Sequence, residues 1–133
     1  MENKIKKIYL AIPYSKMDKE LSFTIANEIS IRFLNKGFNV FSPITHSHPL
    51  VKKGLLNGAW DFWEKIDCQF IDWADEIVVI IPPNNGIELI ETSVGVQGEI
   101  NYAKQTNKPY RYFDYNKKRF VPLISNKEIN NVI

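Results

Sequence analysis

The chain has 133 residues, enough for one domain with a buried core and too few for two. Its apolar and charged fractions, 44% and 24%, are those of ordinary soluble domains, and its net charge of +2 is too small to indicate nucleic-acid or membrane binding. We therefore expect a single domain over residues 1–133 that acts on a small molecule.

The cysteine content and the amino terminus bear on the compartment. The chain has one cysteine, Cys68, which has no partner for an internal disulfide. No long apolar run follows the first lysines, so neither secretion nor membrane insertion is indicated. We expect a cytoplasmic protein.

The first half of the chain predicts two strands and one helix. The run IKKIYLAI, Ile5–Ile12, is apolar and β-branched and stops at a proline, as a buried strand does. Apolar residues recur with helical spacing over Lys19–Lys36, and Gly37 follows at the C-cap position. Phe38–Phe41 is a short strand, and the polar, glycine-containing segment 44–58 after it is a loop with one helical turn.

The second half continues the alternation of helices and strands. We expect helices over 59–74 and 93–108, strands over Glu76–Ile81 and 109–115, a loop over 84–92, a short strand over 121–124 and a helical turn over 126–133. This order predicts an α/β fold: a small doubly wound sheet, flavodoxin-like or Rossmann-like, of four to five parallel strands with helices on both faces.

In such a sheet, ligands bind outside the carboxyl ends of the strands, near the point where the strand order reverses. This rule selects AIPYS after the first strand, SPITHSHP after the second and PPNNGIELIETS after the third, with the helices that follow them. The candidate site residues are therefore sought in these segments.

The helix over 93–108 carries three residues that its apolar pattern does not explain. Ser93 is a good N-cap type, and the helix terminus after it suits an anion such as phosphate. Gly95 and Gly98 each cost about 1 kcal/mol of helix stability relative to alanine. Either a ligand or a neighbouring strand approaches there, or the helix packs closely on the sheet. Glu99 is the unexplained carboxylate.

The helix over 59–74 has a second unexpected carboxylate. Trp60 and Trp63 begin a broad apolar stripe, and Asp67 lies on the same side, whereas Asp61 occupies the outer face. A carboxylate beside an apolar stripe has a paired partner or a function. Asp67 and Glu99, with a tyrosine hydroxyl from Tyr9 or Tyr14, suit cleavage at the anomeric carbon of a sugar.

Three stretches resemble the nucleoside 2-deoxyribosyltransferases and the related 2'-deoxynucleoside 5'-monophosphate N-hydrolases. They are KIYLAIPYS, IDCQFIDWADEIVVI and SVGVQGEINYAKQTNKPY, and together with their order they span roughly residues 4–112. The likeness is greatest to a phage and bacterial branch with FSPITHSHP, WDFW and SVGVQGEI in this order. The resemblance implies a homo-oligomer in which a neighbouring subunit completes the site.

The resemblance also implies roles for individual residues. Glu99 takes the position of the nucleophile on C1', Asp67 that of the acid that protonates or orients the leaving base, and Tyr9 that of the tyrosine that positions the nucleophile. Ser93 falls where the monophosphate hydrolases have a serine against the 5'-phosphate, which favours a nucleotide over a nucleoside. Transfer and hydrolysis both remain open.

The segments HSHPL and WDFW depart from the pattern of the better-known enzymes, so the substrate is not carried over. His46 and His48 either contact a base or phosphate or are solvated loop residues. Trp60 and Trp63 either stack on a base or form an interface, and we favour the interface. Gly95, Tyr14 and Trp63 join Ser93 and the two histidines as candidate substrate-binding residues.

We expect no cofactor and no metal. The sequence has no glycine-rich dinucleotide fingerprint and no P-loop lysine, and no further histidine or suitably spaced cysteine completes a metal site with the two histidines. Two alternatives to an enzyme remain. One is a protein that binds or sequesters a nucleotide without turnover. The other is nucleic-acid binding, which rests on a few lysines and is the weaker alternative.

Overall fold

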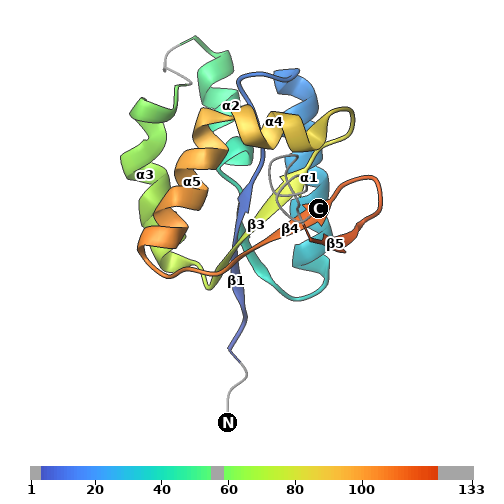
Figure 1. Ribbon diagram of the computed structural model, residues 1–133, viewed down its shortest axis with the longest axis vertical. Helices are drawn as coiled ribbons and strands as arrows, with labels where there is room; N and C mark the ends of the chain where they lie inside the picture. Colours follow the sequence, from blue (N-terminus) through green and yellow to red (C-terminus); the bar gives the residue numbers. More distant parts are fainter. Residues whose placement is uncertain (1–3, 55–58, 123–133) are drawn as a thin grey trace, which may run out of the picture.

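The computed structural model describes residues 4–54 and 59–122. In these residues the elements run in the order β1 (Lys7–Ala11), α1 (Lys19–Asn35), β2 (Asn39–Phe41), α2 (Pro43–Lys52), α3 (Trp60–Trp73), β3 (Glu76–Ile81), α4 (Gly86–Thr92), α5 (Val94–Gln105), β4 (Tyr110–Asp114) and β5 (Arg119–Val121). Figure 1 shows the sheet at the centre with the helices around it.

The described strands form one sheet in the order β2-β1-β3-β4-β5. The first four are parallel, and β5 pairs antiparallel with β4. The chain moves from β1 outward to β2 and then crosses to β3 on the other side of β1, so the strand order reverses between β1 and β3. The predicted α/β fold with a sheet of four to five strands is confirmed, and the fifth strand is antiparallel.

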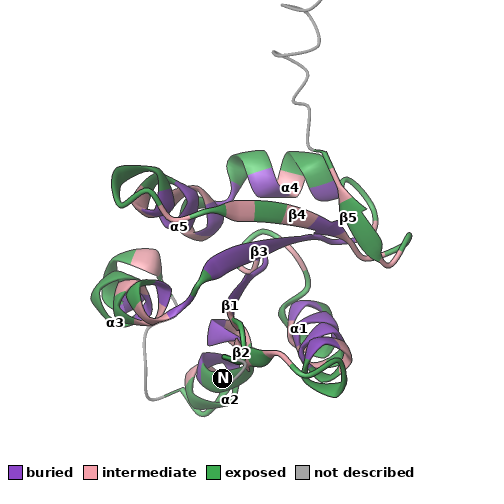
Figure 2. Cartoon of the chain, turned by 90° about the horizontal axis from the view of Figure 1, so that it is seen from below, coloured by how far each residue is buried: buried purple, intermediate pink, exposed green. Residues whose placement is uncertain are grey.

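Helices cover both faces of the sheet, and each face has its own core (Figure 2). On one face, Ile8 and Leu10 of β1 pack with buried residues of α1, such as Ile25 and Ile29. On the other face, Tyr9 belongs to a core formed with α3, α4 and α5. Because side chains alternate along a strand, successive residues of β1 serve opposite cores. No helix among the described residues combines the length and apolar character needed to cross a membrane.

Two segments expected to be loops are helices. Helix α2 begins at Pro43, and its N-cap Ser42 accepts a hydrogen bond from the Thr45 amide at 3.3 Å. Proline in the first turn and serine at the cap are ordinary start signals for a helix, and they outweigh the polar composition on which the loop prediction rested. Helix α4 follows Asn84 and Asn85, both in the left-handed region with φ 62° and 60°.

The carboxyl-terminal strand lies earlier than expected. Strand β5 covers Arg119–Val121, after a turn in which the Lys117 amide donates to Asp114 at 2.8 Å and Lys118 has φ 54°. The predicted strand over 121–124 therefore overlaps it only at its first residue, and residues 123 and 124 lie outside the described residues. So does the helical turn predicted over 126–133.

An ion cluster around one buried carboxylate lies at the amino ends of the strands. Glu76, 3% exposed, begins β3 and accepts two hydrogen bonds from Arg111 of β4, at 2.9 and 2.7 Å. Lys6 lies 2.8 Å from the same carboxylate. The three charges join the segment before β1 to β3 and β4, at the end of the sheet opposite to the reversal-point loops.

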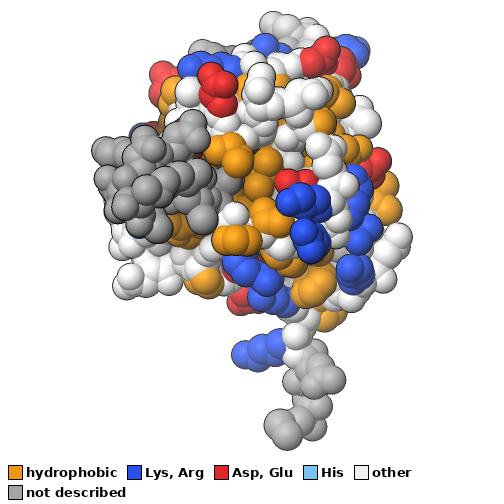
Figure 3. All heavy atoms as spheres, turned by 45° about the vertical axis from the view of Figure 1, so that its right-hand side comes forward, with side chains coloured by type: hydrophobic (Ala, Val, Ile, Leu, Met, Phe, Trp, Pro, Cys, Tyr) orange, Lys and Arg blue, Asp and Glu red, His pale blue; other side chains and the backbone are white. Residues whose placement is uncertain are grey.

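The surface away from these features mixes side-chain types. From the side of α1 and β5, which Figure 3 brings forward, basic side chains lie beside acidic and hydrophobic ones. Ile31 and Leu34 of α1 are 58% and 50% exposed. The two residues are one turn apart on the helix, and a few exposed apolar side chains are ordinary for a folded domain.

Candidate active site

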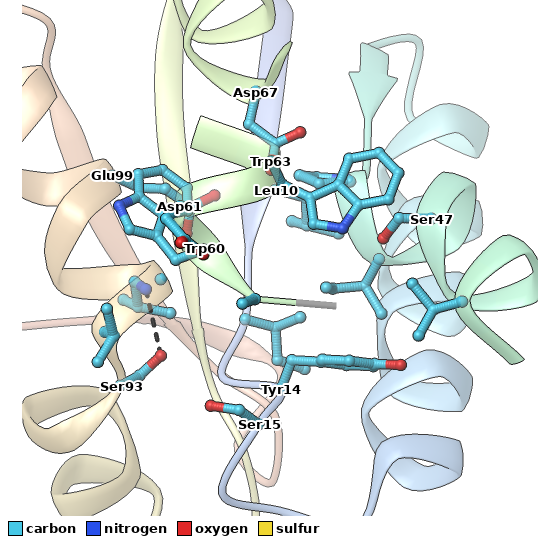
Figure 4. Close-up of a pocket in the computed structure, with 18 residues that line it drawn as sticks. Leu10, Tyr14, Ser15, Ser47, Trp60, Asp61, Trp63, Asp67, Ser93 and Glu99 are labelled. Atoms are coloured by element: carbon cyan, nitrogen blue, oxygen red, sulfur yellow. Dashed lines mark hydrogen bonds between the residues drawn. The ribbon is translucent and has the colours of Figure 1, made fainter. Parts of the chain in front are cut away.

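A cavity of about 380 Å³ opens at the carboxyl end of β1, where the strand order reverses. Its size is within the range of ~300–1,000 Å³ that is usual for small-molecule sites. It is lined by Leu10, Ile12, Tyr14, Ser15, Pro43, Ile44, Ser47, Val51, Ala59, Trp60, Asp61, Trp63, Asp67, Ser93, Val94, Gly95, Val96 and Glu99. Figure 4 shows how the labelled members of this set surround it.

Two buried carboxyl groups reach the cavity from neighbouring helices. Glu99 of α5 is 5% exposed and Asp67 of α3 is 7% exposed, and both line the cavity. The Tyr9 hydroxyl, on β1 beneath them, donates a hydrogen bond to the Glu99 carboxylate. The structure therefore brings together the three residues that the sequence singled out for catalysis.

The electrostatics of this group favour the protonated forms. Burial raises the pKa of Glu99 to about 8; the hydrogen bond from Tyr9 opposes this rise and the Asp67 carboxyl adds to it. Burial also raises the pKa of Asp67 to about 7. Near neutral pH Glu99 is therefore mostly protonated and Asp67 is partly ionised, since burial disfavours the charged form of each carboxyl group.

Tyr9 completes this arrangement as a hydrogen-bond donor. Burial, followed by the Glu99 and Asp67 carboxyls, raises the pKa of Tyr9 well above its ordinary value. Its phenol therefore stays protonated and donates to Glu99. A donated hydrogen bond favours the ionised form of Glu99, which is the form that can attack an electrophilic carbon.

The start of α5 forms one wall of the cavity. Ser93 is buried, and its hydroxyl oxygen accepts a hydrogen bond from the Val96 amide at 3.1 Å, which caps the helix as its sequence predicts. Gly95, one turn before Glu99, also lines the cavity. A Cβ atom added at Gly95 would meet only Trp60, at 3.8 Å, which is an ordinary contact.

Gly98 has a different role from the one expected. A Cβ atom there would lie 2.5 Å from both Cε2 and Nε1 of Trp60 on α3. The indole therefore occupies the space that any other residue at 98 would need. We expected a ligand, a strand or the packing of the helix on the sheet to explain Gly98, and this is wrong. Residue 98 is a glycine because helices α3 and α5 pack closely together there.

The aromatic and acidic residues at the start of α3 also face the cavity. Trp63 is 7% exposed within the single chain, so the protein itself covers a side chain for which we favoured an interface. Trp60 and Asp61 line the same cavity. Asp61 is exposed, as its expected place on the outer face implies, and it also lines the cavity (Figure 4).

The two histidines behave differently. His46 is exposed and is not part of the cavity lining, with its ring centroid 6.0 Å from that of Phe41. His48 is 5% exposed, so the solvated-loop alternative is wrong for it. It lies behind Tyr14, which does line the cavity, and its Nδ1 atom is 2.6 Å from the Tyr14 hydroxyl.

Sequence reasoning selected the loop after β1 and the segment that forms α2, but it named neither Ser15 nor Ser47 as a candidate site residue. Ser47 of α2 and Ser15 of that loop line the cavity. The cap of α2, a serine followed directly by proline, was the available signal, because a helix starting at residue 43 places Ser47 and His48 on its inner side. Residues 4–54 and 59–122 contain no cluster of three or more acidic, histidine or cysteine side chains suited to a metal ion.

Comparison with known proteins adds a family and a related fold. A family model described as a domain of unknown function, DUF1937, matches residues 6–115. The chain belongs to this family. The match runs from the segment before β1 to the residue after β4, so the DUF1937 domain holds all the cavity-lining residues.

The DUF1937 domain also resembles a solved structure of known activity. It is similar to a 2-deoxyribosyltransferase from Bacillus psychrosaccharolyticus, with a TM-score of 0.59 and 22% identity over 93% of this chain and 80% of that chain. Likeness at this identity shows a shared fold. No curated protein sequence matches the chain.

Proposed function

We propose that this protein cleaves the N-glycosidic bond of a 2'-deoxynucleoside or of its 5'-monophosphate. The observation that carries the proposal is the buried Glu99 carboxyl, which lines the cavity, accepts a hydrogen bond from Tyr9 and has the second carboxyl, Asp67, beside it. A pair of carboxyl groups, one attacking and one supplying a proton, is the usual arrangement for retaining chemistry at an anomeric carbon. The fold shared with a 2-deoxyribosyltransferase supports the same reaction class.

In the proposed reaction the Glu99 carboxylate attacks C1' and forms a C1'–O bond. The C1'–N bond breaks, and its electron pair goes to the base, which takes a proton from Asp67. Tyr9 holds the attacking oxygen through its hydrogen bond. A second base or a water molecule then attacks C1', the C1'–O bond to Glu99 breaks and frees its carboxylate, and the Asp67 carboxylate takes the proton of the attacking group. Attack by the base completes a transfer, and attack by water completes a hydrolysis.

The cavity supports both a nucleoside and a monophosphate. Three carboxyl-bearing residues line it, Asp61, Asp67 and Glu99, and carboxylates disfavour a phosphate through charge repulsion. The first turn of α5, with Ser93 and Gly95, is the positive end of a helix, and this end favours the binding of a phosphate. The substrate screen below therefore includes both classes.

The test incubates the purified protein with each deoxynucleoside and each 5'-monophosphate, with and without a second free base, and separates the products by chromatography. We expect Glu99→Ala to reduce turnover by at least ~10³-fold, because it removes the nucleophile. Glu91→Ala, which removes an exposed glutamate on α4, is the matched control and should retain full activity. Equal activity in both variants would refute the role of Glu99.

A second function is favoured by one observation. With a pKa of about 8, Glu99 is largely protonated in the free protein at neutral pH, and a protonated carboxyl is a hydrogen-bond donor rather than a nucleophile. A protein that binds nucleotides without turnover would use it in this way. Calorimetric binding of a deoxynucleotide that is returned intact at every pH between 6 and 9 would establish this alternative.

A further inference from the structure

A chain of polar side chains with the buried His48 at its centre lies behind one residue of the cavity wall, Tyr14. The Tyr14 hydroxyl lies 2.6 Å from Nδ1 of His48, and Nε2 of His48 lies 3.3 Å from Oε1 of Glu20. The last contact is within ion-pair range without meeting hydrogen-bond geometry. The same Glu20 oxygen is 2.8 Å from Nζ of Lys52. The chain of contacts therefore runs from the cavity to the surface.

Three separate segments supply these residues. Tyr14 belongs to the loop after β1, Glu20 to the first turn of α1, and His48 to the inner side of α2. The imidazole is 5% exposed and packs against the Phe23 ring, with centroids 4.8 Å apart. A polar ring so deeply buried is costly unless its nitrogens are stabilised. Nδ1 has a hydrogen bond with Tyr14, and Nε2 has the Glu20 carboxylate nearby without a hydrogen bond.

The charges give the hydrogen bonds a direction. The hydrogen bond from Lys52, and then the contact with His48, hold the pKa of Glu20 below its usual range, so Glu20 is ionised. A carboxylate beside Nε2 favours the tautomer that carries its hydrogen there, which leaves Nδ1 as an acceptor. Tyr14 therefore donates its hydroxyl hydrogen to His48.

This bond fixes how Tyr14 meets the cavity. In Figure 4 the Tyr14 ring is seen edge-on below the cavity, with its hydroxyl directed away from Asp67 and Glu99. The ring, rather than the hydroxyl, is thus presented to the interior. Loss of the His48 acceptor would leave a loop residue free to rotate, because a single exposed or half-buried tyrosine keeps several side-chain conformations.

We propose that His48 and Glu20 are positioning residues that hold the Tyr14 ring as a fixed wall against the bound ligand. The proposal rests on the proposed function for the identity of that ligand, and on the structure alone for the hydrogen bonds. It assigns no chemical step to any of the three residues. Its two parts are tested separately.

The first test uses the ligand-free protein and needs no activity. The chain has two histidines, so ¹⁵N spectra of the imidazole rings contain two sets of signals, which His46→Asn assigns. We expect His48 to carry hydrogen on Nε2 with an unprotonated Nδ1, and we expect Tyr14→Phe to shift the Nδ1 resonance. Hydrogen on Nδ1 and none on Nε2, or no response to Tyr14→Phe, would overturn the proposal whatever the activity.

The second test measures steady-state kinetics with the deoxynucleoside or monophosphate that the substrate screen finds. Tyr14→Phe and His48→Leu should each raise KM about three- to tenfold and leave kcat within about twofold, the size of one lost hydrogen bond. The double variant should be no worse than either single one, because both remove the same bond. His48→Asn, whose side-chain oxygen can replace Nδ1 as acceptor, should restore KM.

Tyr102→Phe is the matched control, because it removes a tyrosine bond to a carboxylate, Asp72 at 2.6 Å, that lies outside the cavity lining. Additive effects of Tyr14→Phe and His48→Leu, or an equal change in the control, would reject the positioning role. If His48→Leu fails to fold, the KM values of Tyr14→Phe and His48→Asn are compared with that of the wild type instead. If the wild-type protein shows no turnover but His48 has the expected tautomer, the proposed function is wrong. The proposal that His48 positions Tyr14 then still stands.

Discussion

Glu99 and Asp67 lie on different helices, but both line the same cavity, and burial there shifts the pKa of each. Burial raises both pKa values, to about 8 and about 7, and the hydrogen bond from Tyr9 partly offsets the rise at Glu99. Groups with raised and closely spaced pKa values both titrate near neutral pH. The reaction proposed for this site needs Glu99 ionised and Asp67 protonated. This is the less populated of the two singly protonated forms, because Asp67 has the lower pKa.

This requirement predicts a bell-shaped dependence of kcat/KM on pH, with a maximum between about pH 7 and pH 8. Below the maximum both carboxyl groups are protonated and no nucleophile is present. Above it both are ionised and no proton is available for the base. Initial rates at subsaturating substrate between pH 5.5 and 9.5, an experimental window chosen to span both values, would check the profile.

Asp67→Asn provides the control for this profile, since it removes one of the two titrating groups. We expect the variant to be slower and to lose the alkaline decline. A wild-type rate that does not change with pH across the window would show that the two carboxyl groups do not both take part.

At the scale of the elements, helices α3 and α5 meet where Trp60 lies against Gly98. The indole fills the space next to the glycine, and the same two helices carry Asp67 and Glu99. Glycine inside a helix is unfavourable by about 1 kcal/mol, so its presence at 98 is explained by the contact and not by helix propensity.

We therefore predict opposite outcomes for two similar substitutions in α5. Gly98→Ala should lower the free energy of unfolding by about 1–3 kcal/mol, because the new methyl group would overlap Trp60, 2.5 Å away. Gly95→Ala meets Trp60 only at 3.8 Å and should raise it by up to about 1 kcal/mol. Urea unfolding of both variants measures the difference, and equal stabilisation would contradict the packing explanation.

The elements also show which features a sequence can predict. Continuous apolar runs and helical periodicity located β1, β3, α1, α3 and α5, and the switch-point rule located the cavity before any contact was known. Helix α2 was missed because composition was given more weight than the cap at Ser42. Helix α4 was missed because it begins after a left-handed asparagine, Asn85, that makes no side-chain cap hydrogen bond. The contact between Gly98 and Trp60 could not be predicted, because no local sequence pattern tells which distant side chain fills the space beside a glycine.

At the scale of the whole molecule, the two ends of the sheet carry different kinds of polar group. The carboxyl end holds the cavity, and the amino end holds Glu76 with Arg111 and Lys6. The hydrogen bonds of Arg111 keep the pKa of Glu76 below its usual range in spite of burial. Such a cluster secures β3 and β4 at the end where no ligand contact is proposed.

We predict that Arg111→Ala reduces the free energy of unfolding by about 1–3 kcal/mol and leaves KM unchanged. It leaves Glu76 with Lys6 alone and removes the guanidinium that lies 3.8 Å from the Phe120 ring centroid. The loss is moderated because Arg111 is half exposed. Arg119→Ala, which removes an exposed arginine on β5, should change stability by less than about 0.5 kcal/mol. Equal losses would show that the cluster contributes nothing particular.

The positions of the tryptophans have a practical consequence. Of the three in the chain, Trp60 and Trp63 line the cavity, and Trp73 at the far end of α3 does not. The near-ultraviolet emission of the protein is therefore weighted towards the cavity, and a compound that enters it changes the surroundings of two of the three emitting rings. Fluorescence can thus survey unlabelled compounds for occupancy of the site before any reaction product is known.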